Sequence, residues 1–288
     1  MSKGKIVVTG ASSGIGLATA QVLTAAGYDV FAGVRKTADA EAVTKACAGA
    51  PGAVIPLMID VTDRATIQSA REVVEKALDG ALLAGLVNNA GIGLGGPLLH
   101  QPVDEFARVI EVNVIGVMAV TQAFAPLVGA RPGAHGKPGR IVNISSVGGV
   151  LAAPFLGAYT ASKHAIEAFS DVLRRELQLY GVDVIVVGPG AVKTKIWDKA
   201  EQQDLSHLAG TDYEASSARF TDYFVKSGRE GLPAEEIGQL ILTILTTARP
   251  KARYAILRNR LSNWTIPRRL PKRMVDRIVG RRLGLLKP

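Results

Sequence analysis

Short apolar segments typical of β-strands alternate with longer segments typical of helices along nearly the whole chain. We expect strands near 6–8, 29–34, 53–59, 86–88, 141–144, 182–187 and 252–257, and helices near 14–26, 38–48, 63–78, 103–128, 160–180 and 234–248. Near-continuous apolar strands that alternate with helices indicate a parallel sheet covered on both faces. The pattern predicts a single-domain α/β fold: a doubly wound sheet of about seven strands, with ligands at the carboxyl ends of the strands.

The composition narrows the class of protein. The chain has 288 residues, of which 48% are hydrophobic, enough for one large core. Its one cysteine, Cys47, excludes an internal disulfide framework, and the four histidines share no ligand-like spacing, so no metal site is expected. The N-terminus lacks the pattern of a secretory signal. No apolar run reaches the ~18 residues of a spanning helix. We therefore expect a cytoplasmic protein.

Positive charge is concentrated at the C-terminal end. The formal net charge is +9, but residues 249–288 contain 13 basic residues and one acid, which leaves residues 1–248 at −3. This end also contains apolar residues and Trp264. A basic amphipathic segment suits peripheral contact with an anionic membrane; a helix that covers the substrate pocket, or a subunit contact, is the alternative. Stacking aromatics are not interleaved through it, so nucleic acid is not an expected partner.

A glycine-rich turn at residues 9–16 joins the first strand to the first helix. Glycine lets the backbone approach a pyrophosphate closely, and the helix N-terminus supplies N–H groups and a positive dipole. Between a strand and a helix, the spacing GxxxGxG therefore predicts a dinucleotide-phosphate site and a Rossmann-like fold. The residues expected to contact the phosphates are Gly10, Ser12, Ser13, Gly14, Ile15 and Gly16.

Tyr159 and Lys163 lie four residues apart on a predicted helix and so project from one face. A phenol, with a pKa of about 10, is a poor base in water. An ammonium beside it favours the phenolate, which allows proton exchange near neutral pH. Ser146 ends the strand-like run 139–146. We predict that these three residues form an active site at the carboxyl end of the sheet.

Taken together, five motifs resemble the short-chain dehydrogenase/reductase family. They are Thr9-Gly-x-x-x-Gly-x-Gly16, Asn88-Asn89-Ala90-Gly91, Ser146, Tyr159-x-x-x-Lys163, and Pro189-Gly190 followed by Thr194. They occur in the family's order and spacing, over about residues 4–260. Residues 89–98 and 146–149 are most similar to the branch that includes 17β-hydroxysteroid and retinol dehydrogenases. The resemblance implies an NAD(P)-dependent oxidoreductase that interconverts a hydrophobic secondary alcohol and ketone, or an alcohol and aldehyde, by hydride transfer.

The resemblance assigns roles to four catalytic residues. It implies that Tyr159 is the general acid/base, that Lys163 lowers its pKa and binds the nicotinamide ribose, and that Ser146 binds the substrate oxygen. The family's serine lies thirteen residues before the tyrosine, which selects Ser146 over Ser145; adjacent strand residues point to opposite faces. Asn113 matches the fourth residue, which holds a water in a proton relay. A structural role for Asn113, tying helix to strand, is compatible with this.

The end of the second strand bears on the cofactor. NAD enzymes of this type usually carry an acid there. Here Val34 is followed by Arg35 and Lys36, and two cations suit a 2′-phosphate. We therefore favour NADP(H); NAD(H) stays possible if Arg35 only stacks on adenine. The remaining cofactor contacts implied by the resemblance are Asp60, Val61, Asn89, Ala90, Gly91, Pro189, Gly190, Val192 and Thr194, together with Tyr159 and Lys163.

The expected substrate pocket is apolar, which suggests a hydrophobic alcohol or ketone such as a steroid, a retinoid or a lipid-like carbonyl. Its residues are Gly93, Leu94, Val147, Leu151, Phe155 and Trp197. We expect a catalytic domain at 1–258 that includes a substrate lid at 192–232, and a basic amphipathic C-terminal extension at 259–288.

Two alternatives to this function stay open: a 3-oxoacyl-carrier reductase, and a non-catalytic NADP-sensing scaffold. The scaffold predicts damage at one of the four catalytic positions, and all four are present. By family analogy, the helices at 103–128 and 160–180 pair subunits into a homodimer or homotetramer.

Overall fold

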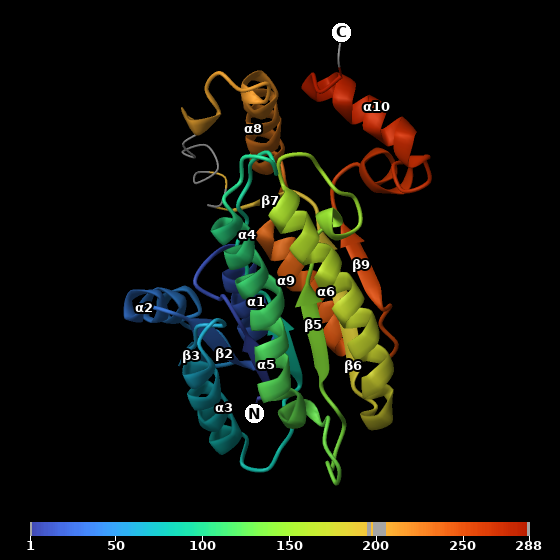
Figure 1. The fold of residues 1–288 in the computed structure, drawn as a ribbon. Helices are drawn as coiled ribbons and strands as arrows, with labels where there is room; N and C mark the ends of the chain where they lie inside the picture. Colours follow the sequence, from blue (N-terminus) through green and yellow to red (C-terminus); the bar gives the residue numbers. More distant parts are fainter. Residues whose placement is uncertain (1, 195–196, 198–205, 287–288) are drawn as a thin grey trace.

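The computed structural model describes residues 2–194, 197 and 206–286. Seven parallel strands form a central sheet in the order β3-β2-β1-β4-β5-β6-β9 (Figure 1). The strands are β1 (Lys5–Val8), β2 (Asp29–Val34), β3 (Val54–Met58), β4 (Gly85–Asn88), β5 (Arg140–Ile144), β6 (Asp183–Pro189) and β9 (Arg253–Ile256). The predicted doubly wound sheet is confirmed.

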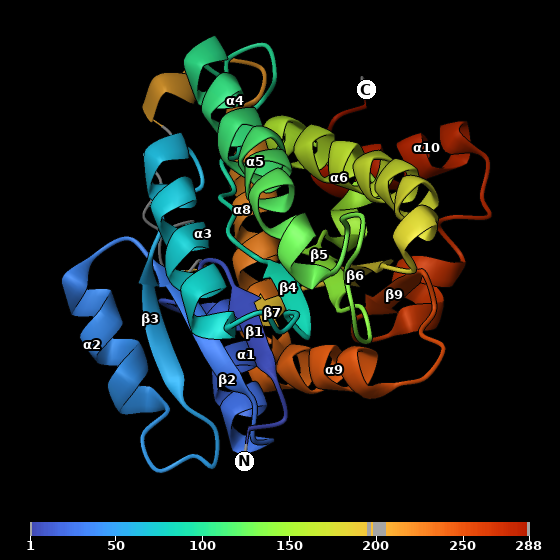
Figure 2. The same cartoon turned by 90° about the horizontal axis from the view of Figure 1, so that it is seen from below.

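Helices cover both faces of this sheet, as the view from below shows (Figure 2). One face carries α1 (Gly14–Ala25), α2 (Thr37–Ala46) and α9 (Ala234–Thr246); the other carries α3 (Arg64–Leu78), α4 (Val103–Ile110), α5 (Gly116–Phe124) and α6 (Gly157–Glu176). Side chains alternate along β1, so that Ile6 and Val8 join the core under α1 and α9, whereas Val7 joins the core under α3 and α5. Two buried cores therefore hold the sheet between its helices.

One helical segment, Val103–Val128, is long and apolar enough to cross a membrane by length and composition alone, contrary to the expectation from the sequence. It consists of α4, a π-helical turn η1 (Glu111–Ile115), α5, and a 3-10 turn η2 (Ala125–Val128). In its most apolar stretch 44% of residues are buried, and Val120 and Phe124 lie in the core under the sheet. The segment therefore has the burial of a core helix.

Two helices lie beyond the carboxyl ends of the strands: α8 (Glu214–Arg229) and α10 (Lys272–Leu283) (Figure 1). We call these two helices the cap. Phe220 of α8 and Leu283 of α10 are buried in one cluster with Phe155, from the segment before α6. The C-terminal segment thus packs onto the rest of the chain. The other short elements are β7 (Val192–Lys193), β8 (Leu232–Pro233), η3 (Val147–Gly149), η4 (Leu177–Tyr180), η5 (Ser206–Leu208) and η6 (Leu261–Thr265).

The elements expected from the alternating pattern are all present, with ends shifted by a few residues. The helix expected to begin at 160 begins at Gly157, so Tyr159 lies in its first turn. Part of the expected lid at 192–232, residues 195–196 and 198–205, lies outside the described residues. The rest forms α8, η5 and the strands β7 and β8, which pair parallel with each other as a separate two-stranded sheet.

Candidate active site

The glycine-rich turn at residues 9–16 is held against the loop that follows β4. The Asn89 amide donates to the main-chain oxygens of Thr9 (3.0 Å) and Gly10 (3.1 Å). The Thr9 hydroxyl accepts from the main-chain N–H groups of Asn89 (3.0 Å) and Ala90 (3.1 Å). Asn89 therefore shapes the turn itself. Its predicted contact with a cofactor, like those of Ala90 and Gly91, stays a prediction.

Glycines make this close approach possible. A Cβ on Gly16 would lie 2.2 Å from the Gly10 oxygen, and a Cβ on Gly10, whose φ is +66°, would lie 2.8 Å from the Ala90 Cα. Gly14 begins α1 beside Thr194. The N-cap residue of α1, Ser13, is exposed and makes no side-chain cap. The uncapped first N–H groups of α1 suit the pyrophosphate of a dinucleotide.

Arg35 and Lys36 are exposed at the end of β2. Arg35 Nη1 lies 3.9 Å from the Asp60 carboxylate, and their side chains are 65% and 35% exposed. Burial raises the pKa of Asp60, but hydrogen bonds from Thr62 and the charge of Arg35 outweigh it, so the pKa lies below its usual value. The pair leaves the Arg35 guanidinium largely in solvent. Two exposed cations with no acid at this strand end suit a phosphate on the adenosine ribose.

Four other residues predicted to contact the cofactor lie in or after three strands, β3, β6 and β7. Pro189 is the last residue of β6, and Gly190 follows it. The Gly190 N–H donates to the Ile256 oxygen (2.9 Å). Val192 is buried in β7. Val61 is also buried, and a Cβ on Gly116 would lie 2.9 Å from its side chain. Val192 shares a buried cluster with Ala11 of the turn, whereas Val61 belongs to the cluster on the other face of the sheet.

Tyr159 and Lys163 lie in the first two turns of α6, next to Ser146 at the end of β5. The Lys163 Nζ lies 5.7 Å from the centre of the Tyr159 ring and donates to the Ile144 oxygen (2.9 Å). The Ser146 Oγ accepts from the Gly148 N–H (3.0 Å) and donates to the Pro189 oxygen (3.5 Å), and a hydrogen bond with Ser146 also acts on Tyr159. The hydroxyl of Ser145 points instead toward the Lys163 oxygen (3.5 Å). The structure therefore places Ser146, as predicted, beside Tyr159.

Burial dominates the ionisation of this pair. It raises the pKa of Tyr159 above its ordinary value, against the opposing effect of the hydrogen bond with Ser146. It lowers the pKa of Lys163 to about 8, against the opposing charge of Glu167. Desolvation is thus the largest influence on both groups, and the predicted effect of Lys163 on the pKa of Tyr159 stays a prediction. Near pH 7 Tyr159 is a phenol, the form that donates a proton.

Asn113 lies in the π-helical turn η1, a local geometry that often marks functional positions. Its Oδ1 accepts from the Ile92 N–H (2.8 Å), and its Nδ2 donates to the Ile92 oxygen (2.8 Å) and to the Ser162 hydroxyl (2.9 Å). A Cβ on Gly91 would lie 3.2 Å from the Asn113 Oδ1 and 3.7 Å from the Lys163 Nζ. Asn113 therefore fixes the loop after β4 against α6. The predicted water relay stays a prediction.

The residues predicted to line a substrate pocket separate into two groups. Gly93 borders Tyr159, since a Cβ there would lie 3.5 Å from the ring. Leu94, Val147 and Leu151 are half-buried in the segments after β4 and β5.

The other two, Phe155 and Trp197, are buried under the cap. Phe155 packs 5.4 Å from the Phe220 ring, and Trp197 packs 4.8 Å from the Phe224 ring. The Trp197 indole N–H donates to the Val192 oxygen (2.6 Å). These two residues therefore support α8.

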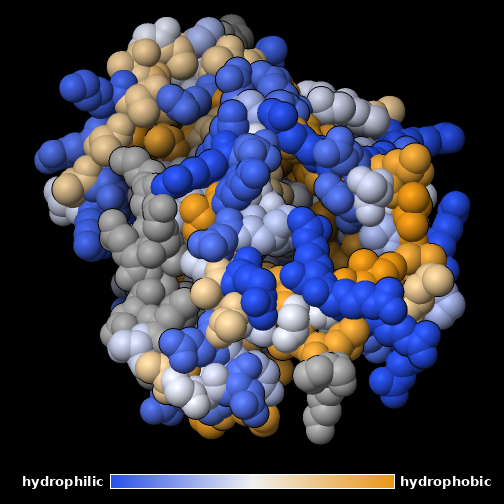
Figure 3. Space-filling view, turned by 90° about the horizontal axis from the view of Figure 1, so that it is seen from above, coloured by the Kyte–Doolittle hydropathy of each residue, from blue (hydrophilic) through white to orange (hydrophobic). Residues whose placement is uncertain are grey.

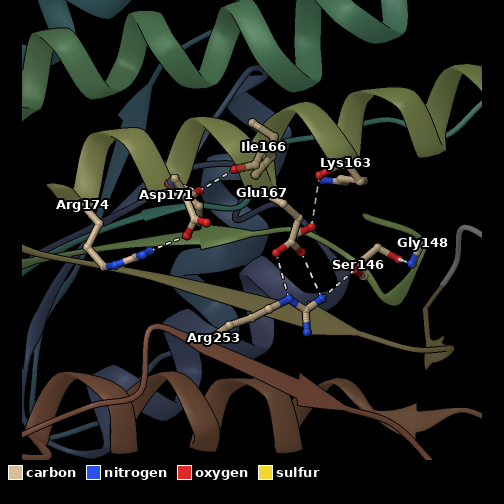
Figure 4. Close-up of polar contacts among 11 residues, drawn as sticks. Ser146, Gly148, Lys163, Ile166, Glu167, Asp171, Arg174 and Arg253 are labelled. Atoms are coloured by element: carbon tan, nitrogen blue, oxygen red, sulfur yellow. Dashed lines mark hydrogen bonds and ion pairs between the residues drawn. The ribbon is translucent and has the colours of Figure 1, made fainter. Parts of the chain in front are cut away.

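Two charged residues next to the site were not predicted from the sequence. Glu167 lies one turn after Lys163 on α6, and Arg253 lies at the start of β9 (Figure 4). They form an ion pair across 86 positions of the chain. Their separation left no local motif. The spacing of four residues from Lys163 to Glu167 was the only signal that could have drawn attention to either.

A family model described as short chain dehydrogenase matches residues 4–205. The chain belongs to this family. It is 38% identical over 272 residues to the NADPH-dependent 3-dehydrocapnine reductase of Ornithobacterium rhinotracheale, covering 94% of each chain. It is 32% identical over 251 residues to the 3-ketodihydrosphingosine reductase of Bacteroides thetaiotaomicron, covering 86% of each.

Among solved structures, the fold is similar to a short chain dehydrogenase/reductase from Burkholderia phymatum in complex with NAD. That similarity has a TM-score of 0.77 at 26% sequence identity, and it covers 96% of this chain and 95% of that one. The resemblance drawn from the sequence motifs is thus confirmed at the level of family and fold.

Proposed function

We propose that this chain uses NADPH to reduce the 3-oxo group of a long-chain amino ketone of the sphingoid type. The observation that carries the proposal is the cluster of Ser146, Tyr159 and Lys163 at the carboxyl ends of the strands. Two relatives that match most of the chain support the substrate class, since they are named as reductases of 3-dehydrocapnine and 3-ketodihydrosphingosine. The first is also named as NADPH-dependent.

In this proposal the cofactor supplies the hydride, and the protein's own groups manage the proton and the charge. Tyr159, kept as a phenol by burial, donates its proton to the carbonyl oxygen as that oxygen becomes negative. The Ser146 hydroxyl accepts from the Gly148 N–H and donates to the Pro189 oxygen (3.5 Å); in this proposal it turns from Pro189 to donate to the same carbonyl oxygen. Lys163, still mostly protonated at pH 7, stabilises the phenolate that remains.

The cofactor is held in this scheme by the two features that fit it. The turn at 9–16 takes the pyrophosphate, and Arg35 with Lys36 takes the 2′-phosphate. The test is kcat/KM with NADPH against NADH for the wild type and for Arg35→Ser/Lys36→Ser. We expect the wild type to prefer NADPH by at least about tenfold and the double variant to lose that preference. A wild type that prefers NADH would refute this assignment.

The substrate class is tested with a panel of ketones at saturating NADPH. We expect the highest kcat/KM with 3-ketodihydrosphingosine, and lower values with steroid, retinoid and 3-oxoacyl thioester ketones. A 3-oxoacyl thioester at the top of the panel would favour the 3-oxoacyl-carrier reductase instead. Tight NADPH binding without turnover of any ketone would favour the non-catalytic scaffold.

We also propose that the chain works in the cytoplasm at the surface of an anionic membrane, where such a substrate is found. Val279 and Leu283 of α10 pack toward α8, while Met274 and Ile278 form an exposed apolar ridge. Exposed arginines flank this ridge, and the top face of the molecule mixes hydrophilic and hydrophobic residues (Figure 3). They are Arg273, Arg277, Arg281 and Arg282. Apolar and basic residues on one helix suit an interfacial position.

Co-sedimentation with vesicles tests the membrane contact. We expect the full chain to bind vesicles that contain anionic phosphatidylglycerol more tightly than neutral phosphatidylcholine vesicles. The variant Met274→Ser/Ile278→Ser should lose most of this binding and keep its activity on a detergent-dispersed ketone. Equal binding to both kinds of vesicle, or none, would remove the membrane from the proposal.

We propose a homodimer or homotetramer paired through the helices at 103–128 and 160–180. Exposed apolar side chains on these helices support it: Ile115, Met118, Val172 and Leu179. Light scattering of the purified chain measures the oligomer, and Met118→Glu/Val172→Glu should shift it to a monomer.

A further inference from the structure

A mostly buried ion pair joins the last strand of the sheet to the helix that carries Tyr159 and Lys163 (Figure 4). Arg253 donates from Nε to Glu167 Oε2 (2.8 Å) and from Nη2 to Glu167 Oε1 (3.0 Å). Their side chains are only 23% and 18% exposed. A two-point pair of a guanidinium and a carboxylate fixes both distance and orientation. Arg253 thereby holds the carboxylate one turn from Lys163.

The same guanidinium also holds the main chain of Ser146. Its Nη2 donates to the Ser146 oxygen (3.2 Å), which also accepts from the Gly149 N–H (3.1 Å). The hydroxyl of Ser146 is the one bonded to Tyr159. One side chain from β9 thus touches the backbone of Ser146 and, through Glu167, sets the field around Lys163.

The neighbouring backbone leaves room for this pair. A Cβ on Gly188 of β6 would lie 2.5 Å from Arg253 Nη2. A Cβ on Gly149 of η3 would lie 3.1 Å from Glu167 Cγ. Two glycines, from separate elements, therefore border the pair on two sides. Side chains at either position would displace it.

The C-terminal segment covers a further side of Arg253. Trp264, in η6, is buried, and its ring lies 4.5 Å from the Arg253 guanidinium and 4.6 Å from the Arg268 guanidinium. A guanidinium over an indole face is attracted by the ring and shielded from water. Trp264 therefore restricts the position of Arg253 from outside the sheet.

We propose that Arg253 and Glu167 are positioning residues for Ser146 and Lys163, and that Trp264 makes the C-terminal segment part of the support of the active site. This inference rests on the proposed reductase function for its activity readout. A second readout, which needs no substrate, is included so that the two can fail separately.

The charged groups around Lys163 determine whether each variant makes Lys163 easier or harder to deprotonate. Within the described residues, Tyr159 and Glu167 face it from its own helix, and Arg253 lies behind Glu167 on β9. The groups that face it from η1 and from the loop after β4 are Asn113 and Gly91, which carry no charge. Removing the Glu167 carboxylate leaves Lys163 easier to deprotonate. Removing the Arg253 guanidinium leaves that carboxylate unneutralised and makes Lys163 harder to deprotonate.

The first arm measures kcat/KM for the ketone from pH 6 to 10. The wild-type value should fall on the alkaline side as Lys163 loses its proton. We expect Glu167→Gln to move this fall toward acid, and Arg253→Met to move it toward alkali, each by on the order of half a pH unit or more. Arg253→Lys should leave its position nearly unchanged but lower kcat about tenfold, since a point charge cannot replace the two-point contact.

A matched control lies one turn further along α6. Asp171 is also an ion-paired acid, bonded to Arg174, but it faces away from the site (Figure 4). Asp171→Asn should leave the pH profile unchanged. Trp264→Leu should lower kcat several-fold, and Trp264→Phe, which keeps an aromatic face, should restore most of it.

The second arm measures the free energy of unfolding against pH, with and without Lys163→Met. The pKa of Lys163 is about 8 in the folded chain and near its ordinary 10.5 when unfolded. Between these values the unfolded chain binds more protons, so the contribution of Lys163 to stability is flat below about pH 8 and rises above it. The pH at which it begins to rise should be lower in Glu167→Gln and higher in Arg253→Met.

The proposal would be overturned if Glu167→Gln and Arg253→Met shift the pH profiles in the same direction. It would also be overturned if neither variant shifts the profile in either arm. If no ketone is reduced but the unfolding profiles shift in opposite directions, the positioning network stands and the proposed function fails. If Arg253→Met does not fold, Glu167→Gln and Arg253→Lys still decide, because only the first is expected to move the profile.

Discussion

The phosphate turn, residues 9–16, is held by main-chain groups, one amide and one hydroxyl, whereas the cap is held by apolar side chains from three distant segments. Asn89 and Thr9 join the turn to the loop after β4 through hydrogen bonds. In the cap, Phe220, Leu283 and Phe155 share one buried cluster. Only a few polar contacts add to this cluster, such as Arg219 Nε donating to the Leu283 oxygen (3.0 Å).

This difference explains why one region is visible in the sequence and the other is not. Where two backbone segments lie too close for a Cβ between them, only glycine fits, as at Gly16. This requirement is visible in the sequence as a glycine at a fixed position. An apolar cluster accepts many side chains of suitable volume. It therefore leaves a composition and no motif.

The largest effect is expected at Tyr159, the proton donor that both regions are proposed to serve. Tyr159→Phe removes the proton donor and keeps the ring. We expect kcat to fall by about 10²–10⁴-fold while NADPH affinity and the unfolding midpoint stay near wild type. Stopped assays with excess enzyme measure the residual rate. Activity within a few-fold of wild type would mean that neither region is organised around Tyr159.

The phosphate turn is tested by Gly16→Ala. The added Cβ would lie 2.2 Å from the Gly10 oxygen, so the turn must open. Overpacking of this kind costs about 1–3 kcal/mol, which corresponds to a loss of NADPH affinity of roughly 5- to 150-fold. Cofactor fluorescence measures the affinity.

Gly80→Asn is the control for that variant. Gly80 also has a positive φ, +84°, but no atom lies within 4 Å of its Cβ position, and Asn tolerates this conformation. Its NADPH affinity should equal that of the wild type. An unchanged affinity in Gly16→Ala would show that the turn is as adaptable as the cap.

The smallest effect is expected in the cap. Phe220→Ala removes the ring that packs on both Phe155 and Phe224. We expect KM for the ketone to rise about tenfold with NADPH affinity unchanged, because the cap lies apart from the phosphate turn. Val73→Ala, an exposed position on α3 outside the proposed subunit contact, should change neither value. A matching loss of NADPH affinity would contradict the separation of the two regions.

The sequence predicted local structure closely wherever a residue type is demanded locally. The strand–turn–helix at the N-terminus and the position of Tyr159 and Lys163 on one helix agree with the structure, and Ser146 lies beside Tyr159; the catalytic roles of these residues stay predictions. The shifts in the pKa of Tyr159 and Lys163 could not be predicted from their helical spacing, because desolvation is the largest cause of both. Burial is a property of the whole fold.

The roles of Phe155 and Trp197 were less clear for a related reason. Both are apolar residues near the site in sequence, and both prove to support α8. Which face of a loop an aromatic side chain occupies depends on what packs against it. Here the packing partners come from α8, which begins some sixty residues after Phe155.

What the sequence alone determined is the frame and the family: a parallel sheet, a glycine-rich turn between β1 and α1, and the family to which Ser146, Tyr159 and Lys163 point. These follow from local rules of periodicity, backbone space and residue type. Only the tertiary structure decided that Arg253 of β9 donates to Glu167 and Ser146 while its guanidinium stacks on Trp264. That contact joins residues up to 118 positions apart, and its geometry exists only when the sheet, the helix and the C-terminal segment are all in place.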